Sequence, residues 1–188
     1  MFKRMLLVLV ALAPTLARAE IEAGTIELGG SSRLALQTGS VKASGTPTSD
    51  QTELALDAGG LYYVTPMIGI GAELLVDRVT DKTGGVSSTF TQTGIGPKIG
   101  IDVPLSHATS FFGEAMVGWA SRDLDGAKSS GAIFGLTGGL KFFPASALSL
   151  DVGLRLQHTE ASPSGSGATV SFTSFGLVLG LSGYVNAR

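Results

Sequence analysis

The fold of this chain is decided by the stretch Leu148-Ser149-Leu150-Asp151-Val152-Gly153-Leu154-Arg155-Leu156. Every even-numbered residue in it is apolar, and every odd-numbered residue is polar or glycine. Successive side chains of a β-strand point to opposite faces of the sheet. A period of two therefore predicts a strand with one apolar and one polar face.

The same alternation recurs along the chain, and no segment shows a sustained helical period. The eight alternating segments are residues 25–36, 52–64, 67–77, 89–103, 110–120, 131–143, 147–157 and 169–185. An even number of strands joined in succession returns both ends of the chain to the same side. We predict one all-β domain over residues 20–188, an eight-stranded antiparallel up-and-down transmembrane β-barrel.

The connections between these segments alternate between two classes. Short turns are expected at residues 65–66, 104–109 and 144–146. Longer links, rich in Gly, Ser, Thr and Asp, are expected at residues 37–51, 78–88, 121–130 and 158–168. Short turns on one rim and long loops on the other are typical of a bacterial outer-membrane barrel.

The first nineteen residues predict a secretory signal peptide. A basic start at residues 1–4 precedes an apolar run at residues 5–13 and then Ala17-Arg18-Ala19, which predicts cleavage before Glu20. The apolar run is too short to cross a bilayer as a helix. Cleavage would change the net charge from −2 to −5, and an acidic exported protein has no electrostatic reason to bind nucleic acid.

The composition excludes several kinds of site. The chain has no Cys, so it has no disulfide, thiol nucleophile, thiolate metal site or lipidated N-terminal cysteine. With two histidines in all, a histidine-rich metal site is not expected. We expect no cofactor and no metal.

Eleven charged residues within the eight segments fall on the polar face of their strands. They are Glu27, Arg33, Glu53, Asp57, Glu73, Lys98, Asp102, Glu114, Lys141, Asp151 and Arg155. A Lys or Arg that faces lipid at the bilayer midplane costs about 2–4 kcal/mol, which explains their exclusion from the apolar face. The interior of an eight-stranded barrel is only wide enough for side chains to fill. We predict a lumen crossed by ion pairs, with a structural rather than a catalytic role.

Aromatic residues gather near the ends of the segments. Those beside the short turns or the C-terminus are Tyr62, Tyr63, Phe111, Phe112, Phe142, Phe143 and Tyr184, and those toward the long links include Trp119 and Phe134. Aromatic rings favour the membrane–water interface. The pattern predicts two girdles of interface aromatics.

Two features depart from a regular barrel. Pro97 lies inside a predicted strand, where it lacks a ladder donor, so we expect a β-bulge there. In the last segment Phe175 and Leu177 have the opposite parity to Val170 and Phe172. Either the phase shifts near Thr173 or the strand starts later than drawn.

Three stretches resemble a known family. They are residues 61–71 and 138–144, in which an aromatic-ended strand adjoins a short turn, and the stretch Thr93-Gly94-Ile95-Gly96-Pro97-Lys98. They look like the small outer-membrane β-barrel proteins of Gram-negative bacteria, the OmpA/OmpX-like barrels. The resemblance implies assembly by the outer-membrane insertion machinery and contact with outer-membrane lipid and lipopolysaccharide, with periplasmic termini and extracellular long loops.

Signals for catalysis are few. His158-Thr159-Glu160 invites comparison with outer-membrane lipid A deacylases, but it departs from their His-x-Ser-Asn pattern. The function expected is therefore that of a non-enzymatic outer-membrane barrel with a filled lumen and a role in envelope structure or surface contact. The alternatives are a narrow pore, a lipid A-modifying enzyme and a soluble lipocalin-like carrier.

Overall fold

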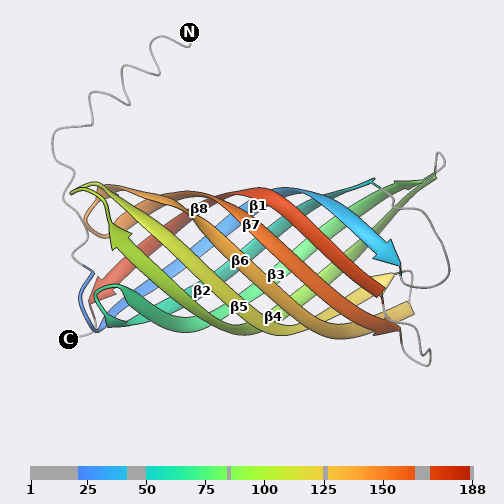
Figure 1. Ribbon diagram of the computed structural model, residues 1–188, viewed down its shortest axis with the longest axis horizontal. Helices are drawn as coiled ribbons and strands as arrows, with labels where there is room; N and C mark the ends of the chain where they lie inside the picture. The colour runs from blue at the N-terminus through green and yellow to red at the C-terminus, as the bar shows by residue number, and fades with distance from the viewer. Residues whose placement is uncertain (1–20, 42–49, 84–85, 125–126, 164–169, 187–188) are drawn as a thin grey trace, which may run out of the picture.

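The computed structural model describes residues 21–41, 50–83, 86–124, 127–163 and 170–186 as one closed barrel of eight strands (Figure 1). The strands are β1 (Thr25–Val41), β2 (Asp50–Thr65), β3 (Ile68–Thr83), β4 (Val86–Pro104), β5 (Thr109–Leu124), β6 (Ala127–Ala145), β7 (Leu148–Pro163) and β8 (Val170–Asn186). No helix among these residues is long and apolar enough to span a membrane. The predicted signal peptide lies outside the described residues and stays a prediction.

Each strand pairs antiparallel with the next, and β8 pairs with β1 to close the ring. Thr25 at the start of β1 lies opposite Asn186 at the end of β8, so both strands meet at one end of the barrel, called here the terminal end. The other end is called the far end. The predicted up-and-down topology is confirmed.

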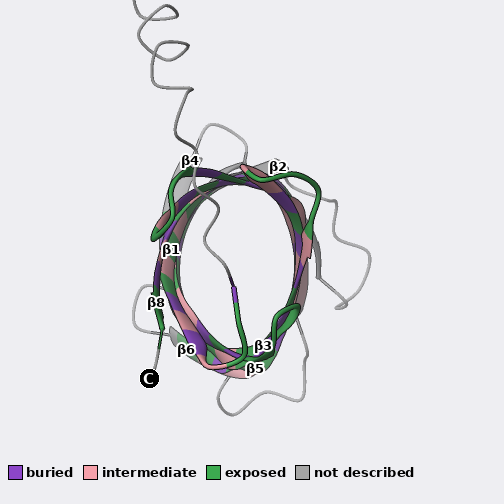
Figure 2. Cartoon of the chain, turned by 90° about the vertical axis from the view of Figure 1, so that its left-hand side faces the viewer, coloured by how far each residue is buried: buried purple, intermediate pink, exposed green. Residues whose placement is uncertain are grey.

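The two faces of the wall differ as the alternation predicts. In β7, Leu150 and Leu154 are 47% and 51% exposed, whereas the next residue, Arg155, is 2% exposed. The described side chains of the other strands show the same alternation of burial, and Figure 2 shows buried and exposed residues mixed around the wall. The apolar rows therefore form the outer wall, and the charged rows fill the lumen. This arrangement excludes the lipocalin-like carrier, because such a carrier would hold its apolar rows inside.

The strands run further toward the far end than the alternation predicts. The β3–β4 ladder continues through Arg78 opposite Thr91 to Thr83 opposite Val86, and the β5–β6 ladder continues through Asp123 opposite Lys128. Most of the predicted loops at 78–88 and 121–130 is therefore strand. Ladder pairing uses backbone groups, so it continues where the side chains no longer alternate between apolar and polar.

Both predicted irregularities are absent. Ile95 pairs with Trp119 and Lys98 with Met116 in a single register, so Pro97 interrupts the β4–β5 ladder locally and makes no bulge. The β1–β8 register is unbroken from Val170 to Asn186, so the phase does not shift near Thr173. Phe172 shares the inward parity of its strand, as the next subsection describes.

Candidate functional site: the charged lumen

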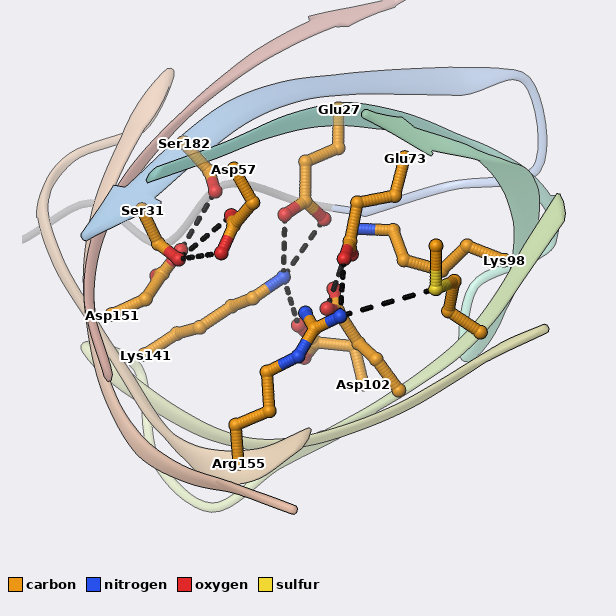
Figure 3. Close-up of polar contacts among 12 residues, drawn as sticks. Glu27, Ser31, Asp57, Glu73, Lys98, Asp102, Lys141, Asp151, Arg155 and Ser182 are labelled. Carbon is orange, nitrogen blue, oxygen red and sulfur yellow. Dashed lines mark hydrogen bonds and ion pairs between the residues drawn. The ribbon is translucent and has the colours of Figure 1, made fainter. Parts of the chain in front are cut away.

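The lumen contains the predicted charged residues whose side chains the structure describes. These are Glu27, Arg33, Asp57, Glu73, Lys98, Asp102, Glu114, Lys141, Asp151 and Arg155, and each lies buried or half-buried on the inner face. The side chain of Glu53 lies outside the described residues. Figure 3 shows most of this set converging from several strands on the barrel axis. The charges form clusters stacked along that axis.

The cluster nearest the terminal end is built around Lys141. Its Nζ lies 2.8 Å from Glu27 and 3.4 Å from Asp102. The Tyr63 hydroxyl donates a further hydrogen bond to the Glu27 carboxylate, at 2.7 Å. The Lys141 Nζ also lies 5.5 Å from the centre of the Phe112 ring, within the range of a cation–π contact. One cation thus serves two carboxylates in a largely aromatic setting.

The central cluster is built around Glu73. Its carboxylate lies 2.6 Å from Arg155 Nη2 and 3.7 Å from Lys98 Nζ, and Lys98 also contacts Glu114 at 3.3 Å. Gly135 gives the guanidinium its space, because a Cβ there would lie 2.8 Å from Arg155 Nη2. A side chain at this position would push the guanidinium away from Glu73.

Two further carboxylates are held by hydroxyl groups. Ser31 donates to Asp57 at 2.7 Å, while Ser149 and Ser182 donate to Asp151 at 2.6 and 2.7 Å. Both carboxylates border a cavity of 40 Å³ that Arg155 also lines. A water molecule needs about 10–15 Å³ measured in this way, so the cavity has room for water but is far too small to be a channel.

An apolar layer separates the central cluster from the far end. It comprises Ala55, Leu75, Met116, Ala120 and Ile133. Leu75 stands between Glu73 and Asp77 on the inner face of β3. This layer places apolar side chains from β2, β3, β5 and β6 in the lumen between the two sets of charges.

The far cluster is built around Asp77. Its carboxylate accepts hydrogen bonds from Gln157 at 2.9 Å and Gln92 at 3.1 Å, and Arg33 lies 3.3 Å away. The Gln92 carbonyl oxygen accepts from Arg122 at 2.7 Å. Of these residues only Arg122 lies outside the predicted strand segments.

Arg122 caps this cluster from within an aromatic pair. Its guanidinium carbon lies 4.3 Å from the centre of the Phe90 ring and 3.7 Å from that of Phe172. The two ring centres are 6.3 Å apart. Phe172 is thus an inward residue that packs on a buried cation, which is why its parity differs from that of the outward apolar row.

The sequence analysis missed Asp77 and Arg122 as lumen residues. Asp77 ends a predicted segment, and Arg122 falls in a predicted loop. The odd or even position of each residue in its strand could have identified them. Asp77 lies an even number of residues from Glu73, and Arg122 lies an even number from Glu114, so each shares the face of that lumen residue. Extending the alternation past the last apolar residue would have placed both in the lumen.

Four of the nine predicted interface aromatics lie inside the barrel, and the interface location of the other five stays a prediction. Tyr62, Phe111, Trp119, Phe134 and Phe142 lie exposed on the outer wall, whereas Tyr63, Phe112, Phe143 and Tyr184 are buried on the inner face. Adjacent residues of a strand point to opposite faces, so in each aromatic pair one ring faces outward and the other inward. The inward rings of Tyr63, Phe143 and Tyr184 pack with Ile21 and Leu61 at the terminal end.

The two histidines lie outside the lumen network. His107 is exposed in the short connection between β4 and β5. His158 stands half-exposed on the outer wall, with Nδ1 2.8 Å from Thr173 Oγ1 and Nε2 3.6 Å from Glu160. Within the described ranges no group of three or more His, Cys, Asp or Glu side chains is placed to hold a metal ion.

The closed barrel with an apolar wall and a charged lumen has a counterpart among known protein families. The family model described as the outer membrane protein beta-barrel domain matches residues 5–182. The chain belongs to this family. Its strands are transmembrane strands, and its location is the outer membrane. No curated protein matches the sequence significantly.

Solved structures of outer-membrane proteins share the fold. Neisserial surface protein A (NspA) is 16% identical with a TM-score of 0.58, and the match covers 85% of this chain and 96% of that one. OprG of Pseudomonas aeruginosa is 13% identical with a TM-score of 0.54, and the match covers 90% of this chain and all of OprG. AlkL is 15% identical with a TM-score of 0.53, over 93% of this chain and 96% of AlkL. At such identities the likeness is one of fold alone.

Proposed function

We propose that this protein is a non-enzymatic barrel of the outer membrane, with a structural or surface-contact role in the cell envelope. The observation that carries the proposal is the filled lumen. Large side chains occupy the lumen at successive levels from the terminal end to the far end. They include Tyr63, Lys141, Met116 and Arg33, each no more than 2% exposed. Such a barrel offers its outer wall and its loops for interaction rather than its interior.

The proposal includes an orientation and two kinds of partner. The terminal end, with its short turns, would face the periplasm, and the far end would face outside. The outer wall would contact membrane lipid and lipopolysaccharide, and the insertion machinery would bind the chain during assembly. The support is the asymmetry of the connections, since short periplasmic turns and longer extracellular loops are the rule in such barrels.

Fractionation combined with surface proteolysis tests location and orientation together. The protein should fractionate with outer membranes, and protease added to intact cells should cut the far-end connections and spare the short turns. An epitope tag inserted after Ser146 provides the matched site at the terminal end. Digestion of that tag in intact cells would overturn the orientation.

Conductance separates the filled barrel from the narrow pore. A filled lumen predicts little or no steady current in a planar bilayer, because ion pairs and an apolar layer occupy the axis. Steady single-channel currents from the parent protein would favour the pore. An Ile133→Gly, Met116→Gly variant is the positive control, since it removes the bulk of the apolar layer.

One observation favours a second candidate function, a lipid A-modifying enzyme. His158 touches a hydroxyl and lies near a carboxylate, a set of groups that can activate a nucleophile. They stand on the outer wall, beside Phe134, where membrane lipid lies. Mass spectrometry of lipid A from cells with the parent protein and with His158→Ala tests this. An acyl-chain difference that depends on His158 would favour the enzyme, and identical spectra would favour the non-enzymatic barrel.

A further inference from the structure

The chain ahead of β1 turns into the terminal opening of the barrel. Viewed from that end, the described segment leading to β1 lies within the outline of the barrel (Figure 2). Ile21 is 5% exposed. It packs with Leu61, Tyr63, Phe143 and Tyr184, which come from β2, β6 and β8. An isoleucine in a freely extending terminal segment would be solvated, so this burial reflects a specific contact.

A tight reversal holds the segment in place. Gly24 has φ of 93°, a left-handed conformation that side-chain-bearing residues rarely adopt. The Gly24 N–H donates to the Tyr63 carbonyl at 2.8 Å, and the Thr25 N–H donates to the Glu22 carbonyl at 3.1 Å. The Glu22 N–H donates in turn to Thr25 Oγ1 at 3.1 Å. The turn fixes the direction in which Ile21 points.

The residues under Ile21 belong to the ion-paired network. Tyr63 donates to Glu27, the principal partner of Lys141, and the Tyr184 hydroxyl lies 3.1 Å from Ser149 Oγ, which donates to Asp151. Ion pairs are stronger where water is excluded. Ile21 therefore stands between the aqueous phase at the terminal end and the first charged cluster.

We infer that residues 21–24 form a stopper that closes the terminal end of the lumen, with Ile21 as the part that excludes water. The inference rests on the proposed filled lumen and adds that its terminal seal comes from the segment preceding the barrel rather than from the strands. The turn at Gly24 positions the stopper, and the ring of Leu61, Tyr63, Phe143 and Tyr184 receives it.

Cysteine labelling tests the stopper, because the chain has no cysteine of its own. Ser149→Cys places a thiol at a fully buried position beneath the seal, and Ser146→Cys places one in an exposed turn at the same end. A small charged methanethiosulfonate reagent should label the buried thiol about tenfold or more slowly than the exposed one, because labelling requires local opening. Adding Ile21→Asp should remove most of this difference.

Ala23→Asp is the matched control, since it introduces the same charge into the same segment at an exposed position. It should leave the labelling rate of Ser149→Cys unchanged. If Ile21→Asp prevents folding, as judged by the heat-dependent gel shift, Ile21→Ala replaces it and should also accelerate labelling. The mass of each purified protein confirms that all variants keep the same N-terminus.

Two outcomes overturn the stopper. Ser149→Cys could label as fast as Ser146→Cys with Ile21 intact, or its rate could be the same with and without the Ile21 substitution. Conductance of the parent protein, recorded in parallel, tests the proposed function separately. A conducting parent overturns the filled lumen, whereas a silent parent with unchanged labelling overturns the stopper alone.

Discussion

The charged clusters at the two ends of the lumen have central residues of opposite charge. At the terminal end one cation, Lys141, serves the carboxylates of Glu27 and Asp102. At the far end one carboxylate, Asp77, accepts from a guanidinium and from two neutral amides. The terminal cluster therefore depends on a single opposite charge, whereas the far cluster shares its central charge among several donors. Loss of the centre should cost more at the terminal end.

The largest effect is expected for Lys141→Ala. It leaves Glu27 and Asp102 buried without the cation that contacts both of them, and breaking a buried pair from one side costs about 3–5 kcal/mol of unfolding free energy. Because two buried carboxylates lose their partner, we expect this variant to lie toward the upper end of that range. Urea titration in lipid vesicles measures the loss of unfolding free energy. The folded fraction is read from the different migration of unheated and heated protein on a denaturing gel. The triple variant Lys141→Met, Glu27→Gln, Asp102→Asn is the control, and it should regain most of the stability.

Asp77→Asn tests the far end and should cost less, about 3 kcal/mol. The amide keeps the shape of the carboxylate, but it removes the charge that faces Arg33 and turns a donor toward one of the donating amides. Asp123→Asn, at an exposed position of β5, is the matched control and should change the unfolding free energy by less than about 1 kcal/mol. A far-end loss equal to that of Lys141→Ala would contradict the contrast between the two ends.

An adjacent pair of tyrosines sharpens the contrast between the inner and outer faces. Tyr63→Phe removes the hydroxyl that donates to the Glu27 carboxylate and should cost about 1.5–3 kcal/mol, the range for hydrogen bonds to charged groups. Tyr62→Phe, one residue away on the outer wall, should change stability by no more than about 0.5 kcal/mol. Equal effects for the two substitutions would contradict the assignment of Tyr63 to the lumen.

The smallest effect is expected at the turn of the stopper. Gly24→Ala places a side chain at φ of 93° and should cost about 1–2 kcal/mol. Gly138→Ala is the control, since a Cβ there meets its nearest atom at an ordinary 3.7 Å. The same urea titration compares the two variants. A neutral Gly24→Ala would show that the turn does not need the left-handed conformation.

The alternation of apolar and polar residues predicts most of the fold, but it does not predict strand length or the direction of every aromatic ring. The number of strands, their antiparallel order and the face of each follow from a period of two that the apolar rows impose. Strand length does not follow from this period. Backbone pairing continues past Arg78 and Asp123, where the outward-facing residues are polar. The aromatic girdles were drawn from position along the chain alone, and Tyr63 and Phe143 show that parity decides which ring faces lipid.

The sequence by itself determined that the chain is an eight-stranded barrel with its apolar rows outward and its charges inward, because that information is local and repeats every two residues. Only the tertiary structure decided which charges pair. Glu27 and Lys141 are 114 residues apart in the chain and meet only because the ring closes. The burial of Ile21 and the stacking of Arg122 between Phe90 and Phe172 were decided in the same way. Each depends on the three-dimensional shape of the lumen, which no single strand encodes.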